Sequence, residues 1–159
     1  MNKVDDKASK NQPGSQGGPL ILIVEDDPSL SKMYALKFQN EGFRVLIAND
    51  GAKGLQMAAS ENPNLILLDM MLPKYSGIEF LEQLQQHSQN TKVPILALSN
   101  LTEKQEADRA LKLGVREYLA KAMNTPEDVV VKVKHYLGMT KPQGVAQNQS
   151  PASTPSTQS

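Results

Sequence analysis

Acidic side chains follow two of the apolar segments of this sequence, at the point where each segment ends. Glu25 and Asp26 come directly after the apolar residues 20–24, and Asp69 comes directly after the apolar residues 65–68. Carboxylates that lie close together repel one another and have raised pKa values, unless a cation neutralises them. Oxygen ligands without Cys or His favour a hard cation, and a small set that leaves room for water favours Mg²⁺.

Two other polar residues stand near the ends of apolar segments. Ser99 follows the apolar residues 94–98, and Lys121 comes two residues after the segment 115–119. A hydroxyl, an ammonium group, a divalent cation and a carboxylate together form a site for phosphoryl chemistry. The cation and the ammonium group offset phosphoryl charge, the hydroxyl donates a hydrogen bond, and the carboxylate can be the nucleophile.

Five apolar segments alternate with helical patterns, and their order predicts how these residues are brought together. The segments are 20–24, 43–48, 65–68, 94–98 and 115–119. The first, third and fourth are apolar throughout, as in strands buried on both faces of a parallel sheet, whereas the other two contain charges and suit edge positions. Right-handed crossovers between five β-α units give a doubly wound, flavodoxin-like α/β fold with strand order 2-1-3-4-5 and helices on both faces. Ligands of this fold class bind beyond the carboxyl ends of the strands.

The predicted helices have recognisable N-terminal caps. Asp27 precedes a proline and is expected to cap the first helix, so it is left out of the metal site. Ser76 with Glu79, Thr102 with Gln105 and, more loosely, Thr125 with Asp128 fit capping boxes.

Composition changes at both ends of the chain. Residues 1–18 and 140–159 hold few large apolar side chains, so they cannot bury enough surface to offset their chain entropy and are expected to be disordered. One domain is therefore predicted at 19–139. The residues after it are too few and too polar for a DNA-binding or catalytic output module, so we expect a stand-alone domain.

The overall composition excludes several classes of function. Lys plus Arg and Asp plus Glu are both 17, so no net charge favours nucleic acid as a partner. The absence of Cys excludes a disulfide scaffold, cysteine-ligated zinc and a thiol nucleophile. No apolar run approaches the roughly 18–20 residues of a membrane span, and residues 1–6 lack the apolar stretch of a signal peptide. We therefore expect a cytoplasmic protein without a membrane partner.

Four segments resemble the motifs of the receiver domain of bacterial two-component response regulators, and they follow the predicted strands in the order of that family. These segments are 21–28, 67–73 with Gly77, 94–99 and 114–121. The resemblance covers the whole predicted domain.

The resemblance implies a role for each acidic residue. Asp69 matches the phosphoacceptor, which receives a phosphoryl group from a phosphohistidine on a sensor histidine kinase or a histidine phosphotransfer protein. Asp26 matches a direct Mg²⁺ ligand, Glu25 matches a ligand that acts through water, and Asp69 also belongs to the metal ligands. The backbone carbonyl of Met71 matches a further ligand.

The same resemblance implies a switch that controls a protein-binding surface. Lys121 matches the lysine that contacts the phosphoryl group, Ser99 the switch hydroxyl and Tyr118 the switch aromatic residue. The surface would be formed by the fourth helix, the fifth strand and the fifth helix, around Lys104, Ala107, Arg109 and Tyr118. A downstream protein would bind there, and the receiver would be a monomer or a phosphorylation-linked homodimer. Such a protein catalyses only its own phosphorylation and dephosphorylation.

Three alternative functions differ in how the site is used. A phosphorelay intermediate would pass the phosphoryl group to a histidine phosphotransfer protein, and an interaction module would resemble a receiver without being phosphorylated. A Mg²⁺-dependent phosphatase with an aspartyl nucleophile is disfavoured, because the first strand ends in Glu-Asp-Asp and no insertion is long enough for a cap.

Two residues depart from the family pattern. The family usually has proline after the lysine, often with a cis bond, whereas Lys121 is followed by Ala122. A cis bond to a residue other than proline costs roughly 2.5–4 kcal/mol, so a trans bond is predicted. Asn100 stands where a small residue is usual and is predicted to narrow access to Asp69.

Overall fold

Strands and helices alternate along the described chain. The structure is a computed structural model that describes residues 17–87, 92–100 and 103–139. The strands are β1 (Leu20–Val24), β2 (Arg44–Ala48), β3 (Leu65–Asp69), β4 (Ile95–Ser99) and β5 (Glu117–Ala120). The helices are α2 (Pro28–Asn40), α3 (Gly51–Glu61), α4 (Gly77–His87), α5 (Lys104–Lys112), the short η1 (Lys121–Met123) and α6 (Pro126–Tyr136). The predicted tails lie outside the described residues, except for Gly17 and Gly18.

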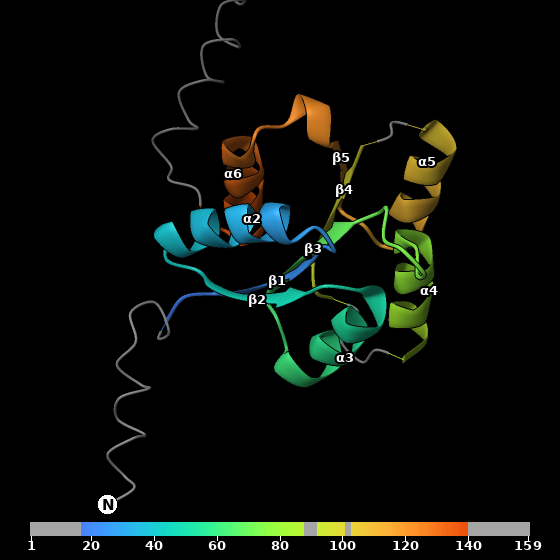
Figure 1. Cartoon of the computed structure of the whole chain (residues 1–159), viewed down its shortest axis with the longest axis horizontal. Coiled ribbons are helices and arrows are strands. Elements are labelled where there is room, and N and C mark those ends of the chain that lie inside the picture. The colour runs from blue at the N-terminus through green and yellow to red at the C-terminus, as the bar shows by residue number, and fades with distance from the viewer. Residues whose placement is uncertain (1–16, 88–91, 101–102, 140–159) are drawn as a thin grey trace, which may run out of the picture.

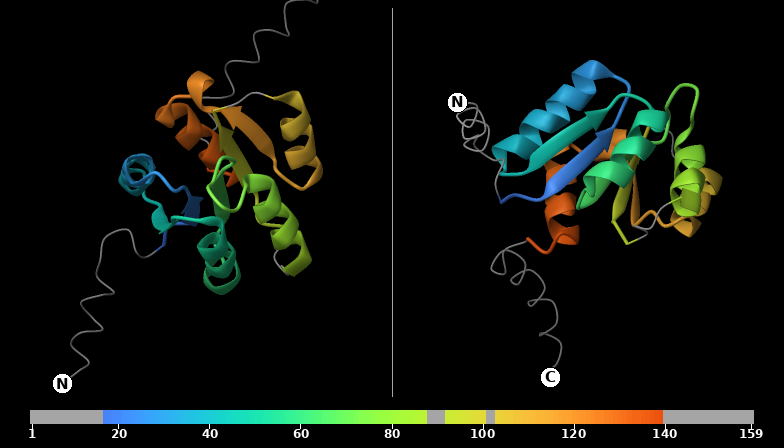
Figure 2. Two further views of the ribbon diagram at one scale, coloured as in Figure 1. Left: turned by 45° about the vertical axis from the view of Figure 1, so that its right-hand side comes forward. Right: turned by 90° about the horizontal axis from the view of Figure 1, so that it is seen from below.

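All five strands lie in one parallel sheet in the order β2-β1-β3-β4-β5, which confirms the predicted fold class and strand order. Helices α2 and α6 cover one face of the sheet, and α3, α4 and α5 cover the other (Figure 1; two further views in Figure 2). Among the described residues, no helix combines the length and the apolar character that spanning a membrane requires.

The edge strands β2 and β5 begin later in the sequence than predicted. β5 begins at Glu117, because the Val115 N–H donates to the Ala110 carbonyl (3.1 Å) and so belongs to the turn that ends α5. The strand continues to Ala120, and Lys121 therefore follows it directly instead of two residues later. β2 likewise starts one residue later than predicted.

The predicted N-terminal caps of α2, α4 and α6 are confirmed. Thr102, the predicted cap of α5, lies outside the described residues, and Glu103 at the N-cap position of that helix makes no side-chain cap bond. The Asp27 side chain accepts hydrogen bonds from two N–H groups of the first turn of α2. Ser76 with Glu79 and Thr125 with Asp128 form reciprocal capping boxes at α4 and α6. Each cap sets where its helix begins relative to the preceding strand.

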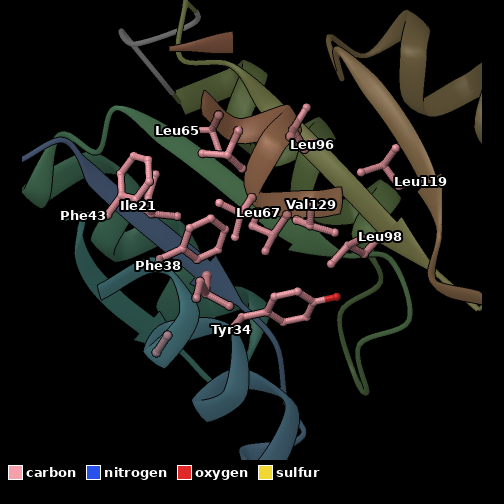
Figure 3. Close-up of a cluster of buried hydrophobic side chains, with 14 residues drawn as sticks. Ile21, Tyr34, Phe38, Phe43, Leu65, Leu67, Leu96, Leu98, Leu119 and Val129 are labelled. Carbon is pink, nitrogen blue, oxygen red and sulfur yellow. The ribbon is translucent and has the colours of Figure 1, made fainter. Parts of the chain in front are cut away.

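Side chains alternate between the two faces of each strand, so the central strands contribute to two separate apolar clusters. The buried residues of the α2/α6 cluster are Ile21, Ile23, Tyr34, Ala35, Phe38, Phe43, Leu65, Leu67, Leu96, Leu98, Leu119, Val129, Val130 and Val133 (Figure 3). Those of the α3–α5 cluster are Leu22, Val24, Ala48, Ala58, Ile66, Leu68, Met70, Leu72, Phe80, Leu81, Ile95, Ala97, Ala110 and Val115. A residue's position in this alternation therefore decides which helical layer it meets.

Candidate functional site

The buried carboxylates of the predicted site lie on the α2/α6 face of the sheet. Asp69 ends β3, and alternation places it on the same face as Leu67 of the α2/α6 cluster. The Glu25 N–H donates to the Ala48 carbonyl (3.0 Å), so Glu25 extends β1 by one residue and shares the face of Ile23. Two rows of aliphatic side chains therefore end in carboxylates at the carboxyl edge of the sheet.

The structure brings the three predicted metal-binding carboxylates together. Glu25, Asp26 and Asp69 each offer one carboxylate oxygen, and these oxygens lie within 4.8 Å of one another. Glu25 and Asp69 are 3% and 4% exposed, whereas Asp26 is exposed. Oxygen ligands on one side and solvent on the other suit a partly hydrated Mg²⁺ ion. The residues present therefore fit the predicted metal.

Lys121 brings a positive charge into this acidic cluster. Its Nζ lies 3.5 Å from Glu25 Oε1 and 3.5 Å from Asp69 Oδ1, and its side chain is 17% exposed. Because β4 lies between β3 and β5, the lysine extends past β4 to reach both carboxylates. Its peptide bond to Ala122 is trans, as predicted.

Backbone donors orient the two buried carboxylates. The Asp27 N–H donates to Glu25 Oε2 (3.1 Å), and the Met71 N–H donates to Asp69 Oδ1 (3.0 Å). Each donor lies two residues after its acceptor, so the turn that follows the strand fixes the side chain that ends it.

The loop after β3 folds back tightly on the end of the strand. The Gly77 N–H donates to the Met70 carbonyl (3.1 Å). A Cβ atom at Gly77 would lie 2.7 Å from the Met70 Cα and 2.6 Å from its Sδ, so only glycine permits this approach. The contact keeps Met71, whose carbonyl is a predicted metal ligand, beside the site.

The electrostatics of Glu25 match the expectation for crowded carboxylates. Burial first, and then the hydrogen bond and the charge of Asp69, raise the pKa of Glu25 to about 7. The Asp27 N–H and the Lys121 ammonium act in the opposite direction. A bound cation would favour the ionised carboxylates, because it offsets the repulsion between them.

The two switch residues of the prediction lie toward the other face of the sheet. Ser99, at the end of β4, is 0% exposed and shares the face of Ala97. Tyr118 packs against the α3–α5 cluster, and its hydroxyl donates to Glu106 Oε1 of α5 (2.5 Å). Burial and the bond to Glu106 raise the pKa of Tyr118 to about 12, although Ser99 lowers it. Tyr118 is thus in contact with α5 and close to Ser99.

Both departures from the family pattern lie at the surface. Asn100 and Ala122 are exposed. The effect of Asn100 on access to Asp69 stays a prediction.

One residue near the site was not expected. Tyr34 of α2 is 3% exposed, and the charges of Glu25 and Asp69 contribute to raising its pKa after burial itself. In the sequence Tyr34 occupies a position of the apolar stripe of this helix, with Ala35 and Phe38. A phenol in such a stripe is the signal that could have identified it.

Comparisons with known proteins agree with this site. The sequence profile of the response regulator receiver domain matches residues 21–134. The chain is 38% identical over 117 residues to the alkaline phosphatase synthesis transcriptional regulatory protein PhoP of Bacillus subtilis, covering 74% of this chain and 48% of that protein. It is 34% identical over 125 residues to the phosphate regulon transcriptional regulatory protein PhoB of Rhizobium meliloti, covering 79% and 55%. The chain thus spans about half the length of the curated relatives it matches.

Solved structures show the same architecture. A CheY-like response regulator receiver domain protein from Methanospirillum hungatei superposes with a TM-score of 0.72 and 27% identity, covering 77% of this chain and 95% of that one. The receiver domain of the sensor histidine kinase PA1611 from Pseudomonas aeruginosa, which has a magnesium ion coordinated in its active site cleft, superposes with a TM-score of 0.69 and 25% identity, covering 77% and 99%. By its sequence profile, its sheet order and its acidic cluster, the chain belongs to the response regulator receiver domain family.

Proposed function

We propose that the chain accepts a phosphoryl group on Asp69 from a phosphohistidine of a sensor histidine kinase or a histidine phosphotransfer protein, in a reaction that depends on Mg²⁺. One observation carries this proposal. Asp69 is a buried carboxylate at the carboxyl edge of the sheet, with carboxylate oxygens of Glu25 and Asp26 within 4.8 Å and Lys121 Nζ at 3.5 Å. The magnesium ion in the PA1611 receiver domain supports the metal requirement.

The side chains suit an in-line displacement at phosphorus. A carboxylate oxygen of Asp69 attacks the phosphorus atom, and the P–N bond breaks as the new P–O bond forms. The imidazole leaves with the electron pair of the P–N bond and takes up a proton. The Lys121 ammonium is placed to neutralise the added negative charge, and the Ser99 hydroxyl is proposed to donate to a phosphoryl oxygen.

The predicted ligands account for the metal requirement. Asp26 and Asp69 would hold Mg²⁺ directly together with the Met71 carbonyl, and Glu25 would act through water. When the ion is bound, its positive charge offsets the charge on the equatorial phosphoryl oxygens. The backbone donors at Glu25 and Asp69 keep both carboxylates oriented before the ion arrives.

We further propose that phosphorylation changes the surface formed by α5, β5 and α6, and that a separate protein binds this surface. Tyr118 supports this proposal, because it lies near Ser99 at the site and is bonded to Glu106 of α5. Lys104, Ala107 and Arg109 are the surrounding contact residues expected on this surface.

Sedimentation with and without beryllofluoride would tell a monomer from a phosphorylation-linked homodimer.

Intact mass after incubation with acetyl phosphate tests the acceptor. A single phosphoryl adduct is expected that requires Mg²⁺ and is lost in Asp69→Asn. An adduct of equal yield in Asp69→Asn would place the acceptor elsewhere. Where the wild type forms no adduct, beryllofluoride is added and the amide NMR spectrum is recorded; an unchanged spectrum would favour an interaction module that is not phosphorylated.

A relay experiment separates the two phosphorylated alternatives. The phosphorylated chain is incubated with a histidine phosphotransfer protein, and the label on each protein is followed. Label that moves to the histidine identifies a phosphorelay intermediate, whereas label that stays on Asp69 until hydrolysis favours a receiver that acts on a binding partner.

A further inference from the structure

Tyr34 is a buried phenol beside the site, and the roles proposed above leave its hydroxyl unused. The side chain is 3% exposed and stacks on Phe38 in the α2/α6 cluster, with 6.5 Å between the ring centroids. Its hydroxyl makes no hydrogen bond with any residue that the structure describes. Among those residues, every side-chain nitrogen or oxygen that is fully buried has a hydrogen-bond partner. Since the Tyr34 hydroxyl has none, its oxygen is not fully buried and is in contact with solvent.

The hydroxyl is directed toward the carboxyl edge of the sheet. Figure 3 shows the oxygen of Tyr34 pointing away from Phe38 and Phe43, at the end of the cluster near Leu98. Side chains of a helix lean toward its N-terminus, and α2 begins directly after the acidic residues that follow β1. The charges of Glu25 and Asp69, in that order, raise the pKa of Tyr34 beyond the effect of burial, which agrees with this placement.

Glu25 is the carboxylate best suited to receive a bond from this phenol. It lies on the same face of the sheet as Ile23 of the α2/α6 cluster, and it is itself buried. Its Oε2 accepts the Asp27 N–H, and its Oε1 lies 3.5 Å from Lys121 Nζ. Each carboxylate oxygen has two acceptor positions, so Glu25 has unused capacity.

We infer that Tyr34 is a positioning residue of the site, whose hydroxyl donates a hydrogen bond through one water molecule to the Glu25 carboxylate. This inference rests on the proposed Mg²⁺ site and adds a residue to it from the helix that covers the site. The phenol would hold Glu25 oriented for the cation. A phenylalanine at this position would keep the packing on Phe38 and lose only the donor.

Magnesium titration of the full chain by calorimetry, without any phosphoryl donor, tests the inference. Tyr34→Phe is expected to raise the Mg²⁺ dissociation constant about three- to tenfold, as for the loss of one ordinary hydrogen bond mediated by water. Tyr136→Phe is the matched control, because the Tyr136 hydroxyl also donates to a carboxylate, that of Glu117, but on β5 away from the acidic cluster (2.9 Å). Its dissociation constant should equal that of the wild type.

A second measurement uses the wild type alone. In protein with ¹³Cζ-labelled tyrosine, Mg²⁺ should shift the Tyr34 resonance and leave that of Tyr136 in place. Equal Mg²⁺ affinity in Tyr34→Phe and wild type, or a Tyr34 resonance that ignores Mg²⁺, would overturn the inference. Both results are independent of phosphorylation, so failure to form an adduct would remove the proposed function without deciding the role of Tyr34.

Discussion

Helices α2 and α6 on one side of the sheet and helix α5 on the other side are attached to it in different ways. Four residues of α2 and three of α6 are buried, and they include the aromatic side chains Tyr34 and Phe38. In α5 (Lys104–Lys112), only Ala110 is buried, and the residue before the helix makes no side-chain cap bond.

Polar contacts also differ between the layers. Ion pairs join α2 to α6 at Lys37 with Glu127 and at Lys134 with Glu41. The side-chain contacts of α5 with the rest of the domain include the Glu106 bond to Tyr118, an exposed ion pair with α4, and the bond that Gln85 of α4 donates to the Leu113 carbonyl (2.9 Å). Helices with few buried apolar contacts open at lower free energy. The carboxylates and Lys121 therefore lie on the side of the sheet that α2 and α6 cover, whereas Tyr118 contacts α5, the helix that is easier to displace.

The largest effect on stability is expected where α2 loses its packing against the sheet. Phe38 is 0% exposed, so Phe38→Ala should lower the free energy of unfolding by about 3–5 kcal/mol, measured by urea denaturation. Leu36→Ala on the same helix is the control, because Leu36 is 58% exposed and its loss should cost no more than about 0.5 kcal/mol. Equal losses in the two variants would contradict the assignment of Phe38 to the packed face of α2.

The second largest effect on stability comes from the ionisation of Glu25. The pKa of Glu25 is about 7 in the folded protein against an ordinary value of 4.5, so the folded state holds this proton more tightly. Its contribution to stability is therefore full below pH 4.5 and is lost as the pH rises through about 7. In metal-free protein this loss should amount to about 1–3 kcal/mol.

Comparison with Glu25→Gln isolates the contribution of Glu25 to the pH dependence of stability. Carboxylates with lowered pKa values, such as Glu41 and Glu117, stabilise the protein in the opposite pH direction, but both proteins share them. Urea denaturation in EDTA at several pH values should show wild-type stability falling relative to the variant between pH 4.5 and about 7. A difference that is constant with pH would remove the assignment to Glu25.

A smaller effect is expected on the local opening of α5 and α6, and it should differ between the two helices. Tyr118→Phe removes the bond to Glu106, and amide hydrogen exchange in α5 should accelerate about fivefold, corresponding to about 1 kcal/mol. Tyr136→Phe removes a similar bond to Glu117, but buried side chains also hold α6. Exchange in α6 should therefore change less. Equal acceleration in the two helices would show that their attachment does not differ.

The smallest effect is expected at the surface of α5. Arg109 Nη2 lies 2.6 Å from Glu82 Oε2, but the two side chains are 60% and 38% exposed. Arg109→Ala should therefore change the free energy of unfolding by no more than about 0.5 kcal/mol. A loss above about 1 kcal/mol would mean that this ion pair, rather than the Tyr118 bond, fixes α5.

Much of the architecture was predictable, because its signals are local. Runs that are apolar throughout identified β1, β3 and β4 as central strands, and charges within the other two runs identified the edges. The starts of β2 and β5 could not be placed by composition. The Val115 N–H belongs to the turn that ends α5, and an apolar side chain does not reveal which carbonyl its own N–H will reach.

The sequence predicted which residues form the site, but not how their side chains are arranged in it. Strand order placed Glu25, Asp26 and Asp69 at one edge, and crowding anticipated the raised pKa of Glu25. The reach of Lys121 past β4 depends on where β5 ends, which was predicted differently. Tyr34 was not singled out, because a helical stripe does not show which way a phenol tip points.

The alternation of side chains along β3 has a consequence for how the sequence can change over evolution. One inserted or deleted residue between Leu65 and Asp69 would turn the Asp69 carboxylate toward the opposite face, away from Glu25 and Lys121, although every residue type would survive. Length variation in relatives of this chain is therefore expected in the connections between elements, such as 62–64, and not within the central strands.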